Sequence, residues 1–245
     1  MYALKANTTG TNNTSVGALS LTTNTTGANN TATGFESLKV NTTGANATAI
    51  GHNALSANTT GANMTAVGYR AGLSHTTGNS STFIGADAGK LTTTGVGNTF
   101  VGDGSGRQNT TGASNVAIGQ SALLANTTAA GNVAIGHSSL LANTTGTENV
   151  AIGTDSLKTN ITTNRNTAVG HSALTANVAH YNTAVGYGAL NANSTGADNI
   201  AVGYGAAELN TTGTRNIAIG ANAYNSSDAE SDNIAIGYNA MTTDT

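Results

Sequence analysis

Residues 132–148, NVAIGHSSLLANTTGTE, hold one complete copy of a motif that recurs along the chain. Its glycine, Gly136, marks the register, and the interval between successive marker glycines is 17 residues, or 16 between Gly170 and Gly186. The marker glycines are Gly17, Gly34, Gly51, Gly68, Gly85, Gly102, Gly119, Gly136, Gly153, Gly170, Gly186, Gly203, Gly220 and Gly237. A fixed period of this kind predicts a repeat architecture in which each copy forms one structural unit.

The length and composition of the repeat predict its secondary structure. We number the repeat from Asn132 as position 1, so that Gly136 is position 5 and the consensus is N-T/V-A-V/I-G-Y/H-x-A-L-x-x-N-T-T-G-x-x. Seventeen residues are too few for a pair of helices, and Gly, Thr and Asn at this density oppose helix formation. We therefore expect an all-β chain, a β-solenoid or β-roll of about 14 coils with 17 residues per coil, forming a single domain over residues 1–245 with partial repeats at 1–12 and 233–245.

The composition narrows the class of protein. Of the 245 residues, 4% are aromatic and 8% are charged, and there is no Pro, Trp or Cys. Disordered chains are usually charged and rich in Pro, so order is expected here. The absence of Cys excludes disulfides and thiolate metal sites. A net charge of −3 provides no basic surface for nucleic acid, no apolar run is long enough to insert into a membrane, and no signal peptide follows Met1.

Alternation along the strand separates an inward face from an outward face. Positions 2 and 4 share one face and position 3, usually Ala, lies on the other. Where position 3 becomes Phe83 or Phe100, position 9, usually Leu, becomes Gly89 or Gly106 in the same repeat. This exchange of volume indicates that positions 3 and 9 fill one interior space. In the alternative arrangement, positions 2 and 4 face inward and the Leu column forms the contact surface.

The outward face then carries a column of β-branched residues. An exposed Val and Ile stripe is an aggregation hazard, and burial against identical chains with cyclic symmetry removes it. We therefore predict that the chain associates with itself as a homotrimer, an end-to-end polymer or both. The predicted oligomer face is made of Val116, Ile118, Val133, Ile135, Val150, Ile152, Val185, Ile200, Val202, Ile217, Ile219, Ile234 and Ile236.

The N-T-T-G segment is expected to form a turn, in which Gly supplies a positive φ and stacked Asn side chains bond to the turn backbones. The same segments are also sequons for N-glycosylation, which would place a ladder of sugars on a secreted fibre. The Thr columns could alternatively order water as an ice-binding surface, although the Thr at positions 13 and 14 lie in a turn. The possible glycosylation sites are Asn7, Asn24, Asn41, Asn58, Asn109, Asn126, Asn143 and Asn210, with Asn160 and Asn193 as variants.

Position 6 forms a candidate surface ladder of rings that could stack on sugars, associate along a fibre or simply cover the coil edges. The ladder residues are Tyr69, His137, His171, Tyr187, Tyr204 and Tyr238, preceded by Phe35 and His52. The His residues have no Asp, Glu or Cys partner at ligand spacing, so no metal or cofactor is expected. No nucleophile stands beside a base, and we expect no enzymatic activity.

Several of these motifs resemble a known family. NTAVG at 166–170 and 182–186, and NVAIG at 115–119, 132–136 and 149–153, resemble the head repeats of trimeric autotransporter adhesins. The longer Y-x-A-L-x-x-N-T-T-G unit is similar to repeats of phage tail-fibre-like proteins. The resemblance implies a left-handed β-roll, trimerisation and a role in surface attachment. It departs from the adhesin heads in period, because their coil is typically shorter.

These observations predict a non-enzymatic structural or adhesive fibre segment, the shaft or receptor-binding head of a surface adhesin or tail-fibre-like protein. Its expected location is extracellular, on a cell surface or in a virion fibre, and its expected partners are copies of itself and a glycan or protein receptor on a host surface. The alternative is a self-assembling filament subunit. Residues 1–12 are already repeat positions 6 to 17 and Thr245 is position 13, so we expect uncapped ends, as in a piece of a longer fibre or a subunit that stacks end to end.

Overall fold

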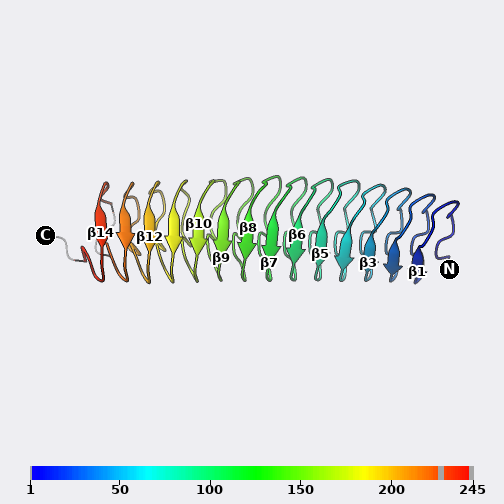
Figure 1. The fold of residues 1–245 in the computed structure, drawn as a ribbon, viewed down its shortest axis with the longest axis horizontal. Helices are drawn as coiled ribbons and strands as arrows, with labels where there is room; N and C mark the ends of the chain where they lie inside the picture. Colours follow the sequence, from blue (N-terminus) through cyan, green and yellow to red (C-terminus); the bar gives the residue numbers. More distant parts are fainter. Residues whose placement is uncertain (1, 226–228, 243–245) are drawn as a thin grey trace. The chain divides into compact units, whose positions relative to one another are not determined.

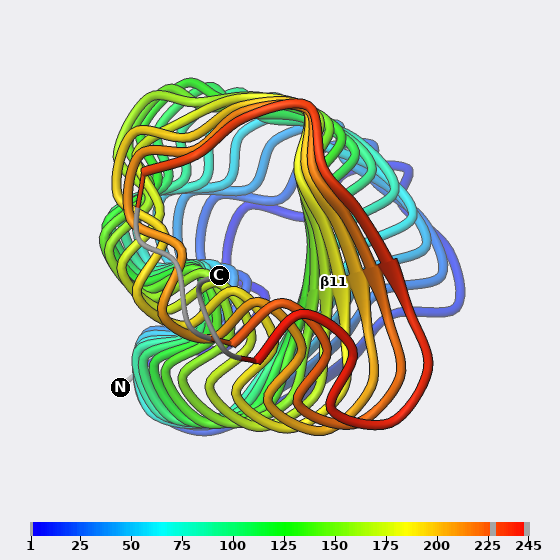
Figure 2. The same ribbon diagram turned by 90° about the vertical axis from the view of Figure 1, so that its left-hand side faces the viewer.

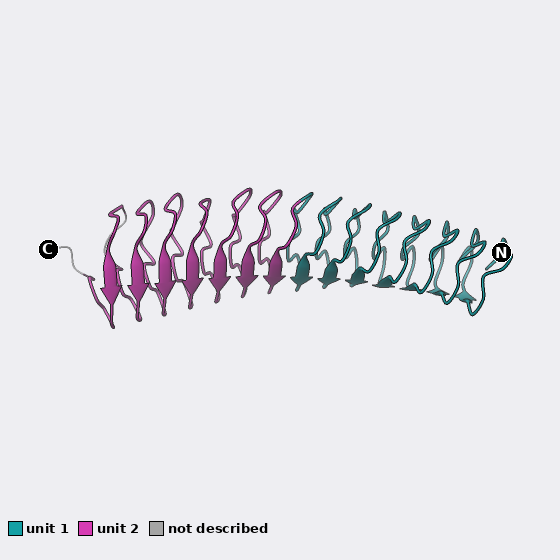
Figure 3. Cartoon of the chain, turned by 45° about the horizontal axis from the view of Figure 1, so that its top comes forward, with its two compact units in different colours: residues 1–128 teal, residues 129–245 magenta. Residues whose placement is uncertain are grey.

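The computed structural model describes residues 2–225 and 229–242 and divides into two compact units, Met1–Thr128 and Ala129–Thr245 (Figure 3). Each unit is a β-solenoid, and no helix occurs in either described range. The three-residue strands of the first unit are β1 (Thr14–Val16), β2 (Thr31–Thr33), β3 (Thr48–Ile50), β4 (Thr65–Val67), β5 (Thr82–Ile84), β6 (Thr99–Val101) and β7 (Val116–Ile118). Those of the second are β8 (Val133–Ile135), β9 (Val150–Ile152), β10 (Thr167–Val169), β11 (Thr183–Val185), β12 (Ile200–Val202), β13 (Ile217–Ile219) and β14 (Ile234–Ile236).

Within each unit every strand pairs in parallel with the strand of the next coil, so that equivalent repeat positions lie side by side (Figures 1 and 2). Thr31 aligns with Thr48 and Ala32 with Ala49, one repeat apart. The shortened repeat keeps this alignment, because Thr167 pairs with Thr183. The expected all-β solenoid with one coil per repeat is therefore confirmed, and the shortened coil absorbs its missing residue outside the strand.

The marker glycine is required by the contact between neighbouring coils. Its φ lies between 125° and 139° throughout, a region that side-chain-bearing residues rarely adopt. A Cβ atom on Gly34 would also lie 2.7 Å from the carbonyl carbon of Gly51 in the next coil. The backbones of successive coils therefore meet at this position with no room for a side chain.

Each coil also turns through non-glycine residues in the left-handed region. The position-9 leucines adopt this conformation, with φ 47° at Leu38 and 49° at Leu140, and both are fully buried. The conformation costs an L-residue about 1–2 kcal/mol, whereas complete burial of a Leu side chain contributes about 1.5–3 kcal/mol. Burial therefore offsets the backbone strain, and the leucine can remain at a corner where glycine would be expected.

The side chains at positions 3 and 9, which the sequence pattern assigned to the interior, lie there in the structure. Away from the terminal coils, position 3 is fully buried, for example at Ala134 and Ala168, and so is the position-9 column, for example at Leu123 and Leu174. The strand residues on either side of position 3 are half-buried or exposed. The assignment of positions 3 and 9 to one interior space is confirmed, and the alternative with the Leu column outside is wrong.

The two phenylalanines occupy the volume that leucine fills in other coils. A Cβ on Gly106 would lie 2.5 Å from a ring carbon of Phe100, and a Cβ on Gly89 would lie 2.5 Å from a ring carbon of Phe83. Gly72, in the coil before Phe83, is in the same situation, since its Cβ would lie 2.6 Å from that ring. Glycine at position 9 is therefore the consequence of an aromatic ring at position 3.

Two columns of asparagine line the turn side of the interior. At position 12, Asn41 Nδ2 donates to Asn24 Oδ1 in the preceding coil and to Gly44 O in its own turn, at 2.8 and 2.9 Å. At position 1, Asn30 Nδ2 donates to the same Gly44 O at 2.9 Å, and Asn30 Oδ1 accepts the backbone N–H of Ala47 in the next coil. The expectation that stacked Asn side chains bond the turn backbones is confirmed, and side-chain amides join neighbouring coils wherever the asparagine columns continue.

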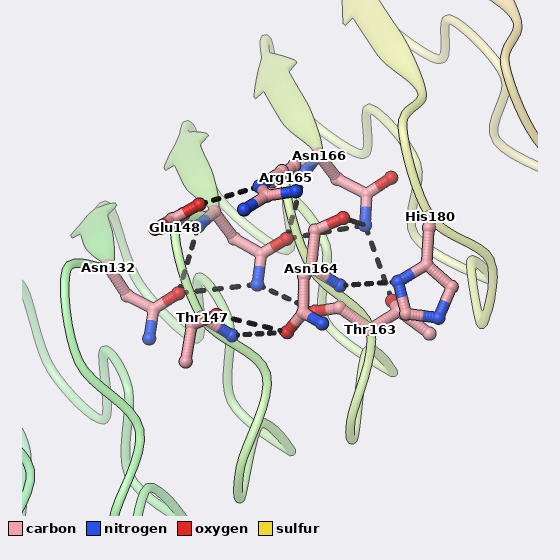
Figure 4. A network of polar contacts seen from close by, with 9 residues as sticks. Asn132, Thr147, Glu148, Thr163, Asn164, Arg165, Asn166 and His180 are labelled. Atoms are coloured by element: carbon pink, nitrogen blue, oxygen red, sulfur yellow. Dashed lines mark hydrogen bonds and ion pairs between the residues drawn. The ribbon is translucent and has the colours of Figure 1, made fainter.

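The second unit has the same network, shown in Figure 4. Asn149 N donates to Asn132 Oδ1 and Asn166 N donates to Asn149 Oδ1, each at 3.0 Å. These side chains are fully buried, and a buried polar group without its partner costs about 1–3 kcal/mol. The network therefore ties the spacing of the coils to hydrogen-bond distances rather than to packing alone.

His75 replaces asparagine at position 12 of one coil. Its Nε2–H donates to Gly78 O at 2.8 Å, which is the hydrogen bond that asparagine makes elsewhere. Asn58 Oδ1, in the preceding coil, and His75 Nδ1 are both buried without a hydrogen-bond partner. Burial lowers the pKa of His75, and the hydrogen bond to Gly78 O acts in the opposite direction.

We expect Phe100→Ala to destabilise the protein by roughly 3–5 kcal/mol, because the interior cannot refill beside Gly106. The double variant Phe100→Ala with Gly106→Leu should recover much of this loss, since it restores the usual Ala and Leu pair at a φ of 54°. Chemical denaturation of both variants measures the effect. Equal stability of the wild type and Phe100→Ala would rule out the shared interior volume.

We expect the melting temperature to fall as the pH is lowered through the range below about 6.5. His75 is held neutral in the folded chain, whereas in the unfolded chain it takes up a proton near its ordinary pKa, so acidification favours unfolding. His75→Asn supplies the consensus residue and should remove this part of the pH dependence in calorimetric scans. Greater stability of the wild type on acidification would instead place a second proton on Nδ1.

Candidate interaction surface

The outward faces of the strands form one continuous surface in each unit. Position 2 is Thr in β1–β6, β10 and β11, Val in β7–β9 and Ile in β12–β14, and position 4 is Val or Ile in every strand except β2. Ile219 is flanked by its equivalents in the coils on both sides, yet it remains 39% exposed. The surface is therefore hydroxyl-rich over β1–β6 and wholly aliphatic over β7–β9 and β12–β14.

The predicted oligomer-face residues all lie on this surface. Val116, Val133, Ile135, Val150 and Ile217 are half-buried by their neighbours. The more exposed members are Ile118, Ile152, Val185, Ile200, Val202, Ile219, Ile234 and Ile236. Their outward orientation agrees with the sequence analysis, and whether another chain covers them remains a prediction.

The position-6 residues form two separate stacks of rings rather than one ladder. In the first unit, the ring centroids of Phe35 and His52 lie 5.2 Å apart and those of His52 and Tyr69 lie 5.5 Å apart. In the second unit, His171, Tyr187 and Tyr204 stack at 5.2 and 5.3 Å with interplanar angles of 7° and 9°. His137 lies between Gln120 and Thr154 along the same column, and Tyr238 follows Ala221. A stack needs rings in adjacent coils, and these interruptions end it.

Ion pairs join charged residues at the same repeat position of neighbouring coils. Arg165 Nε lies 2.7 Å from Glu148 Oε2, and Arg215 binds Asp232 through Nε and Nη2 at 2.6 and 2.8 Å (Figure 4 shows the first pair). The hydrogen bond from Arg215 lowers the pKa of Asp232, and the pKa values of both arginines are raised by their carboxylate partners. The sequence analysis missed these pairs, although opposite charges 17 residues apart were a readable signal.

These ion pairs are exposed and screened by solvent, so they add little to stability. The charged side chains in these pairs are therefore engaged in contacts between neighbouring coils. Within residues 2–225 and 229–242, no group of three His, Cys, Asp or Glu side chains is placed to hold a metal ion, and no helix is long and apolar enough to cross a membrane.

The Thr hydroxyls of the turns are used inside the solenoid. At position 13, Thr25 Oγ1 donates to Thr42 O at 3.0 Å, and Thr42 Oγ1 donates to Thr59 O at the same distance. The same contact recurs from Thr59 to Thr76 and from Thr76 to Thr93. This column therefore joins coils instead of presenting free hydroxyls to water, which weighs against an ice-binding surface at the turns.

The sequon asparagines are the position-12 residues of the buried amide ladder. Asn7 is half-buried, and the other seven, Asn24, Asn41, Asn58, Asn109, Asn126, Asn143 and Asn210, are fully buried, as are the variants Asn160 and Asn193. In a representative coil, Asn143 Nδ2 donates to Gly146 O at 3.0 Å. A glycan on Nδ2 would occupy the space of the preceding coil, to which Nδ2 donates in the ladder, so the fold has no room for sugar at the buried sites.

No protein-family model, curated protein or solved structure matches the chain in comparisons with known proteins.

We expect folded protein secreted from a glycosylating eukaryotic host to carry no glycan on the seven fully buried sequon asparagines. The reason is that the Nδ2 atoms of the ladder lie inside the solenoid. Peptide mapping by mass spectrometry, before and after enzymatic deglycosylation, measures the occupancy of each site. Asn7 is the internal comparison, because it alone of these sequons is half-buried. A folded product with sugar on Asn41 or Asn143 would contradict the ladder.

Proposed function

We propose that this chain is a non-enzymatic structural and adhesive segment of an extracellular fibre, which associates with copies of itself through its outward strand face. The observation that carries the proposal is the position-4 column of Val and Ile, which is unbroken over β3–β7 in the first unit and over β8–β14 in the second, each unit taken by itself. Soluble monomers rarely expose apolar surface of this extent, so a partner surface is the expected cover.

The partner that fits this face best is another copy of the same chain. Every copy presents Val and Ile at the same spacing, and a parallel copy in register aligns column with column. Under cyclic symmetry the contacts between identical copies form a closed ring, so no copy is left with an uncovered contact face. The resemblance to trimeric adhesin heads supports three copies, which makes a homotrimer the proposed assembly.

The interior supports a mechanical role. Neighbouring coils are fastened by strand pairing, by the amide ladder and by Thr hydroxyls, as at Thr167 with Thr183, Asn41 with Asn24 and Thr25 with Thr42. Separating two coils breaks all of these contacts together. A stack built in this way resists extension and bending, as the shaft of a fibre must.

We expect the wild-type protein in solution to have three times the 24.0 kDa mass of one chain. Val185→Asp or Ile135→Asp should dissociate this trimer into single chains. A carboxylate on the outward face would be buried without a partner in the assembly, which is strongly unfavourable. Light scattering coupled to size-exclusion chromatography measures the mass, and circular dichroism verifies that each variant is folded.

Thr195→Asp is the matched control, because Thr195 lies in the same coil as Val185 but on an exposed turn. Its mass should equal that of the wild type. A monomeric wild type, or a folded Val185→Asp variant of unchanged mass, would overturn the proposed interface. A mass that grows without limit with concentration would replace the trimer by an end-to-end filament.

A further inference from the structure

One rung of the ring stack in the second unit is empty, although aromatic residues stand on both sides of it. At position 6 of the last three described coils the residues are Tyr204, Ala221 and Tyr238. The backbones around them are in register, because Asn222 N donates to Tyr204 O at 2.8 Å and Asn239 N donates to Ala221 O at 3.0 Å. Ala221 therefore occupies the rung between two tyrosines.

The geometry of the occupied rungs gives the width of the empty one. Tyr187 and Tyr204 stack with 5.3 Å between ring centroids. Two coils of a parallel sheet separate Tyr204 from Tyr238, about 9.6 Å along the stacking direction. A ring placed over Ala221 would thus stand one rung from each tyrosine, at the distance that the neighbouring rings already adopt. We call the space between Tyr204 and Tyr238 over Ala221 the open rung.

The open rung is accessible to solvent. Tyr204 is 60% exposed, Tyr187 inside the stack is 53% exposed, and Tyr238 reaches 76%. Ala221 is itself partly exposed, so this rung is not sealed from solvent. Both tyrosine rings beside Ala221 are therefore accessible to a ligand.

The polar groups around the open rung favour a neutral ligand with hydroxyl groups. Asn222 Oδ1 and Glu208 Oε2 lie beside Gly205, the residue after Tyr204, because a Cβ on Gly205 would lie 2.7 Å from the first and 3.3 Å from the second. Arg215 is the sole Lys or Arg between residues 199 and 242, and it is paired with Asp232. An anionic ligand would meet a carboxylate and no free cation.

We propose that the open rung binds one neutral pyranose ring of a glycan, held between Tyr204 and Tyr238. A pyranose has apolar C–H groups on its two faces and hydroxyls around its edge. Its faces match the two tyrosine rings, and its edge matches the tyrosine hydroxyls and the acceptors of Asn222 and Glu208. Ligand sites commonly combine apolar walls with a few placed polar groups in this way.

A planar aromatic side chain of another protein would fit the same width but would leave those acceptors without donors. The sugar is therefore the better occupant. The inference rests on the adhesive part of the proposed function and is independent of self-association, because both tyrosines and Ala221 belong to one chain.

The test titrates the intact chain with four neutral tetrasaccharides, built of β-1,4-glucose, α-1,4-glucose, β-1,4-N-acetylglucosamine and β-1,4-mannose. Saturation-transfer NMR detects the contact, and tyrosine fluorescence follows the titration because the chain has no Trp. We expect at least one tetrasaccharide to bind. Tyr238→Ala and Ala221→Tyr, which fills the rung with a ring of the chain itself, should each weaken that binding by about tenfold or more.

The matched control is Ala86→Tyr. Ala86 is an exposed position-6 alanine beside Tyr69, but Asp103 rather than an aromatic residue stands on its other side. This variant should bind as the wild type does. The proposal is overturned if none of the four neutral sugars binds, if binding survives Ala221→Tyr, or if a tetragalacturonate probe binds more tightly than the neutral ones.

The failure of self-association is distinguishable from the failure of the open rung. The same titration on Val185→Asp measures sugar binding in a chain whose outward strand face is disrupted. If Val185→Asp is monomeric and still binds the sugar, the proposed sugar site holds independently of self-association. If neither Val185→Asp nor the wild type binds a sugar, the proposed sugar site is wrong, and the proposed interface between chains is unaffected by that result.

Discussion

The hydrogen bond from a buried asparagine to the turn carbonyl of its own coil is the interaction on which the other features depend. The amide at position 12 and the amide at position 1 both donate to the position-15 carbonyl, as Asn41 and Asn30 do to Gly44 O. Asn41 also reaches back to Asn24, so the turn and the neighbouring coil are set by one side chain. With the turn held in this way, the strands stack in register and positions 2, 4 and 6 point outward.

The thin interior follows from the same constraint. Only one small and one larger side chain fit between the strand and the opposite wall, usually Ala and Leu. Phe100 with Gly106 shows that their combined volume, rather than either residue, is conserved along the column. An interior this narrow leaves two of the three side chains of each strand outside, which is why a chain of modest hydrophobicity still presents an aliphatic face.

The fold was largely predictable from the sequence because its period, its alternating strand and its volume exchange are local patterns. The left-handed conformation of Leu38 and Leu140 was not, since propensity favours Gly at such corners and only tertiary burial reverses that preference. The burial of the sequon asparagines was hidden for a similar reason, because N-T-T-G also has the composition of an exposed turn. The candidate ring ladder was predicted as a column, and its division into stacks depended on residues such as Gln120 and Thr154 at intervening rungs.

The central claim is that identical chains cover the outward strand face, and electron cryo-microscopy of the unmodified chain tests it most directly. The account predicts three parallel solenoids in cross-section, with their Val and Ile columns turned toward a common axis and the N-T-T-G turns away from it. Isolated single solenoids, or assemblies joined through the turns while the strand faces remain open to solvent, would contradict it.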